Sequence, residues 1–331
     1  MMSVEFHLSE IATSLPLGTP VFKGYCQEVS AVLVTYNPGL DGLLASVHAV
    51  ADQVSDIFIV DNASANFSPD WLDKLKGKFA ARLHLLPQSE NLGIGAGHNI
   101  GILHAREQGS TFVLLLDQDS QVEPGMVAQL CNAYRALLEK GVKVAALGPR
   151  YRDDEDGRLS QFVRVGFFGF TRLGCSSANS VVEADFLVSS GALLPLTTIE
   201  SVGLMDEELF IDHVDTEWCF RAKAQGFKIF GVCDAIMTHT LGERRKEIWF
   251  FRRRIIPFHH PFRYYYIFRN SITLYRRNYM PRSWMLADCA RCLKFVFFFG
   301  LVAPNRLACL KMMWLGLKDG TRGIRGKRND F

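Results

Sequence analysis

The stretch "LLLDQDS", residues 114–120, places three leucines directly before two carboxylates, Asp117 and Asp119. An apolar run is typical of a buried strand, and Asp is depleted from strand interiors, so both carboxylates are expected where a strand ends. Paired acidic oxygens at such a place suit a hard divalent cation that keeps water ligands and bridges to phosphate oxygens. A solvated surface pair is the alternative, and it fits poorly with the three preceding leucines.

Around this stretch, from residue 29 to about residue 150, strand and helix patterns alternate. The expected strands are residues 29–37, 56–62, 82–88 and 111–119, and the expected helices are residues 41–53 and 95–109. This alternation predicts an α/β fold with a mostly parallel central sheet covered by helices.

Polar residues follow several of these strands, and ligands of parallel sheets bind at the carboxyl ends of strands. Each polar pair alone is typical of a turn or a helix cap. Together, on one sheet edge, they indicate a ligand site. The pairs are Tyr36 and Asn37, Asp61 and Asn62, and Asp117 and Asp119.

The glycine-rich segment "NLGIGAGHNIG", residues 91–101, opens one of the expected helices. Its spacing is not GxGxxG and it does not follow a first strand, which argues against a dinucleotide-binding dehydrogenase. Its glycines either let the backbone approach a ligand or form a tight loop, and both interpretations stay open.

A second acidic cluster lies in residues 203–226, where Asp212, Asp215 and Glu217 precede or begin a run that stops at Gly226. Acidic residues favour a helix N-terminus, so a purely structural role is one interpretation. Alternatively, one carboxylate acts as a general base toward a second substrate.

Charge is divided unevenly along the 331 residues, of which 48% are hydrophobic and 21% charged. This composition suits one large domain, with or without an appendage. Residues 244–331 hold 20 basic and 4 acidic residues, a net charge of +16, whereas residues 1–243 carry −13. The tail is therefore expected to meet an anionic partner, either nucleic acid or an acidic lipid surface.

The eight cysteines are scattered, and only Cys289 and Cys292 form a CxxC, with no second pair to complete a metal site. Free thiols in a reducing cytosol are expected. The opening "MMSVEFHLSE" lacks the pattern of a secretory signal, and the longest apolar run, from Phe295, is shorter than the roughly 20 residues of a spanning helix. We expect a cytoplasmic chain that does not cross the membrane.

Five motifs occur in a specific order: TYN, VDN, ENLGIGAGHNIG, LLDQD and DEELFIDHVDTEW, followed by Arg221 and an isolated His239. This order resembles the inverting family-2 glycosyltransferases of the GT-A fold, and among them the bacterial rhamnosyltransferases, over about residues 29–245. The resemblance implies an extension (1–28), a catalytic domain (29–243) and a basic, aromatic-rich, partly amphipathic helical tail (244–331). Within the domain, residues 29–120 would bind the nucleotide sugar, and residues 121–243 the acceptor and the base.

The resemblance also implies roles for single residues. Asp215 would be the catalytic base, and Asp119 would bind Mg²⁺ or Mn²⁺ on the diphosphate. His239, in "THTLGE", would lie near the diphosphate and is the second predicted metal residue. Val214 stands where the family often has Glu, which leaves open whether Asp212 or Glu217 assists Asp215. The implied nucleotide-sugar-binding residues are Thr35, Tyr36, Asn37, Asp61, Asn62, Asn91, Gly93, Asn99, Asp117 and His239.

The implied reaction is transfer of L-rhamnose from dTDP-L-rhamnose to a lipid-linked saccharide or a lipid, as in O-antigen, polysaccharide or rhamnolipid assembly. A cation would stabilise the leaving diphosphate, and the base would deprotonate the acceptor hydroxyl, with inversion in one displacement. A family-2 enzyme with another nucleotide sugar, or a non-catalytic sugar-nucleotide-binding protein, remains an alternative.

For the tail, arginines interleaved with aromatic residues suit peripheral attachment to the inner face of the cell membrane, through anionic lipid. Nucleic-acid binding is the rival interpretation. It is disfavoured because the sequence has no RRM, KH or zinc-finger pattern and because the front half is acidic.

Overall fold

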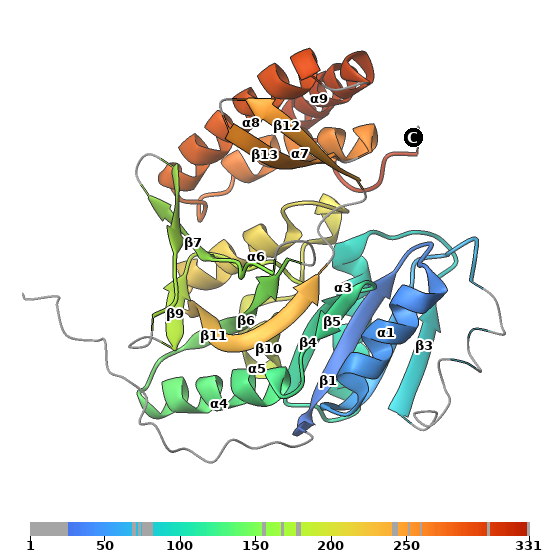
Figure 1. Cartoon of the computed structure of the whole chain (residues 1–331), viewed down its shortest axis with the longest axis vertical. Helices are drawn as coiled ribbons and strands as arrows, with labels where there is room; N and C mark the ends of the chain where they lie inside the picture. The colour runs from blue at the N-terminus through green and yellow to red at the C-terminus, as the bar shows by residue number, and fades with distance from the viewer. Residues whose placement is uncertain are drawn as a thin grey trace, which may run out of the picture.

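The structure is a computed structural model that describes residues 26–67, 71, 74, 82–153, 157–166, 169–176, 180–239, 244–250, 252–258, 260–302 and 305–329. The extension expected for residues 1–28 lies almost entirely outside these ranges. A large mixed sheet with helices on both faces forms the main body, and a layer of helices covers one end of it (Figure 1).

The first half of the main body follows the alternation expected from the sequence. Its elements are β1 (Cys26–Thr35), α1 (Leu40–Ala51), β2 (Val54–Asp61), β3 (Leu83–Pro87), α3 (Ile94–Glu107) and β4 (Phe112–Asp117). All neighbouring strands in this half are parallel. Thr35 lies opposite Asp61 and Val34 opposite Asp117, so the polar residues that follow the three strands reach the same sheet edge.

Strand β1 separates two apolar cores because its successive side chains point to opposite faces of the sheet. Val32 and Val34 belong to the core beneath α3, whereas Ala31 and Leu33 belong to the core beneath α1 and α4 (Met126–Glu139). Helix α3 lies very close to β1, since a Cβ at Gly101 would come within 2.2 Å of the Val32 side chain. Burial on both faces explains the continuous apolar runs in these strands.

The second half adds strands of both directions. The sheet order is β3-β2-β1-β4-β10-β6-β11-β5, with β9 paired to β11, and β10 is antiparallel to both of its neighbours. The elements are β5 (Ser120–Val122), β6 (Val144–Arg152), β7 (Phe162–Gly166), β8 (Gly169–Leu173), β9 (Val181–Ala184), β10 (Leu193–Pro195), α5 (Leu196–Val202), η2 (Glu207–Leu209), α6 (Val214–Ala224) and β11 (Lys228–His239). The prediction of a mostly parallel α/β sheet is confirmed.

The C-terminal region begins with a hairpin and continues as helices. The hairpin is β12 (Arg244–Phe250) and β13 (Arg252–Phe258), and the helices are α7 (Pro261–Tyr275), α8 (Arg282–Val302) and α9 (Arg306–Arg322). Gly316 lets α9 lie directly on α7, because a Cβ there would come within 2.4 Å of the Tyr265 carbonyl oxygen. In the described part of the chain, no helix is long and apolar enough to cross a membrane.

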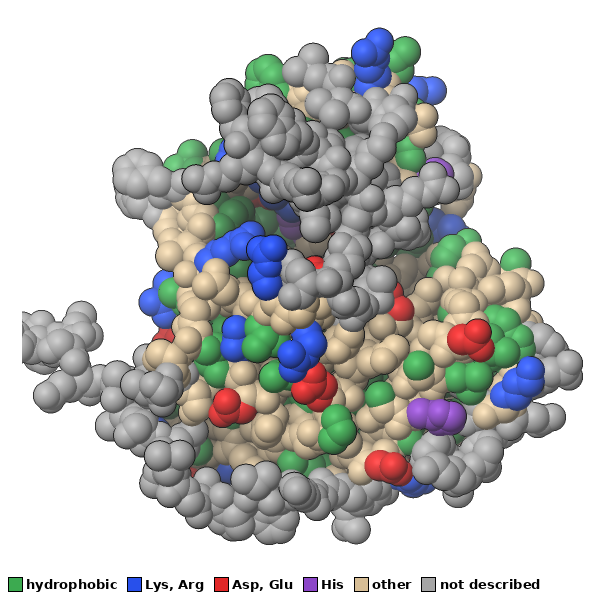
Figure 2. Space-filling model, in the orientation of Figure 1, with side chains coloured by type: hydrophobic (Ala, Val, Ile, Leu, Met, Phe, Trp, Pro, Cys, Tyr) green, Lys and Arg blue, Asp and Glu red, His purple; other side chains and the backbone are tan. Residues whose placement is uncertain are grey.

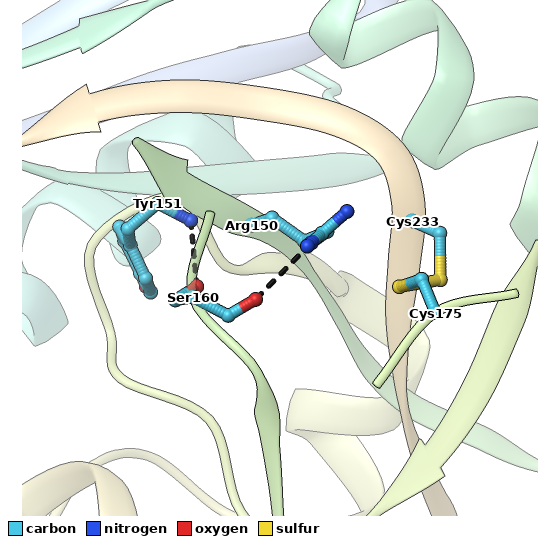
Figure 3. Close-up of a disulfide and its surroundings, with 5 residues drawn as sticks. All are labelled: Arg150, Tyr151, Ser160, Cys175 and Cys233. Atoms are coloured by element: carbon cyan, nitrogen blue, oxygen red, sulfur yellow. Dashed lines mark hydrogen bonds between the residues drawn. A yellow bond between two sulfur atoms is a disulfide. The ribbon is translucent and has the colours of Figure 1, made fainter. Parts of the chain in front are cut away.

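The expectation of free thiols is wrong for two of the cysteines. Cys175, which follows β8, and Cys233 in β11 form a disulfide with a Cα–Cα distance of 5.8 Å (Figure 3). They lie 58 residues apart in sequence. Their proximity arises because β9, just after Cys175, pairs antiparallel with β11, and no local cysteine spacing reveals such a long-range pairing. The other six cysteines form no disulfide.

Candidate active site

The ends of β1 and β2 form one wall of the site through a compact hydrogen-bond network. Thr35 Oγ1 donates to Asp61 Oδ1 over 2.8 Å, and Asp61 Oδ2 accepts from the Ser64 backbone over 3.0 Å. Asn37 joins the same turn, since its backbone N–H donates to Ser64 Oγ and its Oδ1 accepts from the Ala65 backbone. The buried Asp61 carboxylate therefore fixes the shape of this strand end.

Tyr36 presents its ring at the same edge, with 51% of the residue exposed. Its backbone N–H donates to Gln118 Oε1 over 2.9 Å, and Gln118 stands between Asp117 and Asp119. This bond joins the end of β1 to the end of β4. An exposed aromatic face beside two carboxylates is suited to stacking on a nucleoside base.

The glycine-rich segment lies against the loop that precedes α6. Asn62 Nδ2 donates to the Gly93 carbonyl over 3.2 Å, and the Gly93 N–H donates to Asn91 Oδ1 over 2.9 Å. Gly93 has φ +88°, and a Cβ there would lie 2.4 Å from the Phe210 carbonyl oxygen. Of the two interpretations left open by the sequence, the described contacts show a tight loop that closely approaches another backbone segment.

Asn99 is buried on α3, and its amide hydrogen-bonds to the start of η2 and to the segment before it. Its Nδ2 donates to the Met205 carbonyl over 2.9 Å and to Glu207 Oε1 over 2.8 Å, and its Oδ1 accepts from the Met205 N–H. The structure therefore does not bring this amide together with the strand-end residues. Its hydrogen bonds hold the segment that leads into the loop before Asp215.

The two carboxylates of the turn after β4 differ in setting. Asp117 is half-buried, and its N–H donates to Ser190 Oγ, whereas Asp119 is exposed. His239 pairs through its backbone opposite Ser120, next to Asp119, but its side chain lies outside the described residues. Exposed carboxylate oxygen is a ligand that Mg²⁺ and Mn²⁺ accept, so the donor chemistry fits a divalent cation.

No cluster of three possible metal ligands occurs among the described side chains. One or two carboxylates are nevertheless sufficient where substrate phosphates and water complete the coordination. The exposed Asp119 carboxylate therefore suits a cation that binds together with phosphate oxygens.

Asp215 lies in the first turn of α6 and lines a small cavity with apolar neighbours, among them Leu115, Leu194 and Trp218. The cavity measures about 20 Å³, enough for about one water molecule. Burial raises the pKa of Asp215 and the charge of Asp212 adds to this, while hydrogen bonds from Thr216 and from the Ser189 backbone act in the opposite direction. A carboxylate whose pKa is raised is a better proton acceptor.

Tyr151, on β6, shows that the two halves of the site meet. Its hydroxyl donates to the Ser190 carbonyl over 2.7 Å. Burial raises the pKa of this phenol, and the negative charges of Asp117 and Asp215 raise it further. The carboxylates at the end of β4 and at the start of α6 thus both influence the pKa of this one half-buried phenol.

The two acidic neighbours of Asp215 are bound by arginines. Arg263 donates to both carboxylate oxygens of Asp212, over 2.6 and 3.3 Å. Glu217 is fully buried and accepts from Arg221 over 2.9 Å and from Arg277 over 3.0 Å. Of the three acids considered, only Asp215 lines the cavity.

A pair of buried residues on α7, Arg269 and Asn270, holds the loop that leads to Asp215. Asn270 Nδ2 donates to the carbonyls of Leu209, Ile211 and Asp212 over 2.8–3.0 Å, and Arg269 donates to those of Glu208 and Leu209. The loop needs such support because three of its residues have positive φ, which only glycine adopts readily. They are Phe210, Asp212 and His213. Sequence reasoning missed this pair, whose only signal is a polar dipeptide inside the aromatic segment "FRYYYIFRN".

Comparisons with known proteins agree with this geometry. Residues 30–185 match the family described as "Glycosyl transferase family 2". The chain is 31% identical over 301 residues to dTDP-rhamnosyl transferase RfbF of Shigella flexneri, covering 90% of this chain and 97% of the relative. It is 28% identical over 134 residues to N-acetylglucosaminyl-diphospho-decaprenol L-rhamnosyltransferase of Mycobacterium tuberculosis, covering 38% of this chain and 41% of that one.

Two solved structures share the fold at low sequence identity. GalNAc-T7 with UDP, GalNAc and Mn²⁺ has a TM-score of 0.58 and 15% identity, over 90% of this chain and 56% of that one. The mannosyltransferase PcManGT of Pyrobaculum calidifontis, in complex with GDP-Man and Mn²⁺, has a TM-score of 0.53 and 14% identity, over 91% and 76%. Because the match to the Shigella relative covers nearly the whole of both chains, the chain belongs to glycosyl transferase family 2 and is a glycosyltransferase with the GT-A fold.

Proposed function

We propose that this glycosyltransferase moves L-rhamnose from dTDP-L-rhamnose to a hydroxyl of a lipid-linked saccharide or a lipid, with inversion at the anomeric carbon. The observation that carries the reaction type is that Asp215 lines one cavity together with Leu115 of β4, two residues before Asp117. The donor is supported by the near full-length similarity to a dTDP-rhamnosyl transferase. The name of the mycobacterial relative contains a lipid-linked sugar diphosphate, N-acetylglucosaminyl-diphospho-decaprenol, and this supports the proposed class of acceptor.

In the proposed mechanism, the donor lies along the ends of β1, β2 and β4. Tyr36 stacks on the thymine base, and the turn built by Thr35, Asn37 and Asp61 receives the nucleoside. Asn62, Asn91 and Gly93 shape the next stretch of the pocket, Asn99 acts through the segment that it fixes, and Asp117 binds near the ribose.

Asp119, with His239 as a second candidate, would hold a divalent cation on the donor diphosphate. Such a cation, when bound, supplies Lewis-acid stabilisation of the charge on the leaving diphosphate. Both structural neighbours were solved with Mn²⁺, and the exposed carboxylate of Asp119 has the oxygen-ligand chemistry that this ion accepts.

Asp215 carries the proton-transfer step. The acceptor hydroxyl attacks the anomeric carbon on the face opposite the diphosphate, and its proton passes to the Asp215 carboxylate as the new C–O bond forms and the bond to the diphosphate breaks. The raised pKa of Asp215 makes it suitable for this role, and the apolar lining of its cavity limits competing water.

The test is donor hydrolysis over a panel of nucleotide sugars: dTDP-L-rhamnose, UDP-galactose, UDP-N-acetylglucosamine and GDP-mannose, each with Mn²⁺ and with chelator. We expect dTDP-L-rhamnose to be cleaved fastest, and only with the metal. Faster cleavage of another sugar nucleotide would transfer the assignment to a family-2 enzyme with a different donor. The Asp215→Asn variant is the control that ties any cleavage to this site.

A lipid-borne acceptor requires contact with a membrane, so we further propose peripheral attachment to the inner membrane surface through the C-terminal region. The net charge of +16 in residues 244–331 supports this, since each basic residue near an anionic bilayer contributes about 1 kcal/mol.

A further inference from the structure

The basic residues of the C-terminal helices fall into two sets. The first set binds acidic groups or carbonyls of the protein itself: Arg263 with Asp212, Arg277 with Asp206 and Glu217, Arg291 with Asp288, Arg325 with Glu208, and Arg328 with Asp319. These charges hold the helices to the catalytic domain and to one another. Because their charges are already neutralised within the protein, these arginines contribute less to the binding of an anionic partner.

The second set makes no ion pair with the described part of the chain. On α8 it includes Arg282 and Lys294, and on α9 it includes Arg306, Lys311 and Lys318; all except the half-exposed Lys318 are exposed. Within the described residues, none of these five side chains forms a hydrogen bond or ion pair with the loop before Asp215 or with the strand ends. They are therefore the charges that remain for a partner outside the protein.

Large apolar side chains are exposed among these free charges. On α8, Leu286, Leu293 and Phe297 are 61–67% exposed. On α9, Leu307 is 77% and Trp314 59% exposed. Figure 2 shows hydrophobic and basic side chains next to one another at the helical end of the molecule, at the top of the view.

The spacing on α9 places both kinds of residue on one side. Leu307, Lys311, Trp314 and Lys318 follow one another at intervals of four, three and four residues, which is the spacing of a single helix face. The Lys318 ammonium lies 5.1 Å from the centre of the Trp314 ring. Met313 and Gly316 point the other way, since Met313 is buried in the core between the helices and Gly316 contacts α7.

We propose that the outer faces of α8 and α9 form a docking surface for an anionic lipid bilayer, with both helices lying in the headgroup region. This inference deepens the membrane attachment proposed above and rests on it. The lipid docking surface consists of Leu286, Leu293, Phe297, Leu307 and Trp314, with Lys294, Lys311 and Lys318.

The chemistry of this surface favours lipid over other partners. Helices that lie in a membrane interface combine Trp, Phe and Leu with Lys and Arg, as these two do. A second copy docked through the same face by a two-fold axis would bring lysines against lysines. Nucleic acid would use stacked aromatic rings along a groove, whereas most of the apolar side chains here are aliphatic.

The position of the surface relates it to the reaction. Helix α9 lies on α7 through Gly316 and Gly320, and α7 holds the loop that precedes Asp215. A bilayer in contact with α9 is thus one helix layer away from the loop that precedes Asp215.

The test is co-sedimentation of the full chain with vesicles of phosphatidylcholine alone or of phosphatidylcholine mixed with phosphatidylglycerol. We expect binding to the mixed vesicles only. Lys311→Glu combined with Lys318→Glu should lower the partition coefficient by on the order of tenfold or more. Phe297→Ser combined with Trp314→Ser should remove the fraction that stays bound at high salt. All four positions are on the solvent-facing side of a helix, so Tm should stay near that of the wild type.

The matched control reverses two charges elsewhere, Arg106→Glu on α3 with Lys143→Glu before β6, both exposed. It should bind vesicles as the wild type does, apart from a small loss from net charge. Equal loss in the control and in the α9 variant, or no loss in either, would refute the lipid docking surface. So would light scattering that shows a dimer abolished by the α9 variant, or binding of random single-stranded DNA with a steep salt dependence that the variant removes.

Hydrolysis of dTDP-L-rhamnose by water, measured without lipid, separates this inference from the proposed function. Retained hydrolysis with unchanged vesicle binding in the α9 variant would refute the surface and leave rhamnosyl transfer in place. Absence of hydrolysis in the wild type, with vesicle binding that depends on the surface, would refute the donor assignment and leave the surface in place.

Discussion

The proposed donor side and the proposed base side of the active site are built in different ways. On the donor side, polar residues follow β1, β2 and β4 directly, and the parallel register of these strands brings them together. On the base side, Asp215 follows a loop of residues 206–213 whose carbonyls are held by Asn270 on α7, 58–61 residues later in the sequence. The donor side therefore depends on local turns and sheet pairing, and the base side depends on the C-terminal region.

This difference gives the basic tail a second role. Arg263, Arg269 and Asn270 of α7 all bind the loop before the base, so α7 is part of the catalytic structure. The exposed charges of α8 and α9 remain for the membrane contact that we propose. Mutations on the two sides should accordingly separate donor binding from transfer.

The largest expected effect is on the base side. Asp215→Asn keeps the size of the side chain but removes the proton acceptor, so transfer at saturating donor should fall by about 10²-fold or more while the donor Kd changes little. Transfer to acceptor and isothermal titration with dTDP-L-rhamnose measure the two quantities. Asp41→Asn, the same change at an exposed position of α1, should leave both unchanged. A large increase in donor Kd with unchanged transfer would place Asp215 on the donor side instead.

The corresponding change on the donor side is Asp119→Asn. Loss of one carboxylate ligand should weaken Mn²⁺-dependent donor binding by about 10- to 100-fold, and transfer should fall with it. The readout is donor Kd with Mn²⁺ and with chelator. Wild-type activity that is equal in the presence and absence of chelator would contradict the metal role of Asp119.

A smaller effect is expected where the tail supports the base. Asn270→Asp keeps the oxygen that accepts from Arg269 but removes the N–H donors for three carbonyls. Leaving buried groups unpaired costs about 1–3 kcal/mol, so Tm should fall, and transfer should fall about tenfold with donor Kd unchanged. Asn132→Asp on α4 is the matched control. If donor Kd rises as much as transfer falls, the two sides are not independently built.

The smallest expected effect is on stability. The folded protein raises the pKa of Asp215, so the ionised side chain destabilises the fold. The penalty is absent at pH values below about 3.9, the pKa of an ordinary Asp in an unfolded chain. It is complete at pH values above the pKa of Asp215 in the folded protein. Asp215→Asn should therefore raise Tm by about 1–3 °C at neutral pH, with the difference shrinking in acid. A Tm that falls equally at both pH values would mean that Asp215 stabilises the fold.

The contrast between local turns on one side and long-range contacts on the other also explains how much of the fold and of the site could be predicted from the sequence. The alternation of strands and helices and the polar strand ends were readable because periodicity and turn chemistry are local signals. The hydrogen bonds from Arg269 and Asn270 to the loop, and the Cys175–Cys233 disulfide, join segments that are distant in sequence, so no local signal predicts them. The pairing of β12 with β13 was missed for a different reason, since the many basic residues of these strands were interpreted as part of a helical tail.

Asn99 illustrates the boundary between the two kinds of signal. The sequence placed it on the correct helix, beside the nucleotide-binding segment. The structure directs its amide to Met205 and Glu207, because the segment that leads into the loop before Asp215 crosses α3 at this point. Position along the chain predicted the element, but the long-range crossing determined which partner the side chain meets.

The most direct test of the account is the pH dependence of single-turnover transfer from saturating dTDP-L-rhamnose, in the wild type and in Asp215→Asn. We predict that the wild-type rate falls as pH is lowered, with an apparent pKa above that of an ordinary Asp, because protonation removes the base. The residual rate of Asp215→Asn should then not follow this titration. If the variant retains the same acidic limb, another group is the base, and the assignment of Asp215 is wrong.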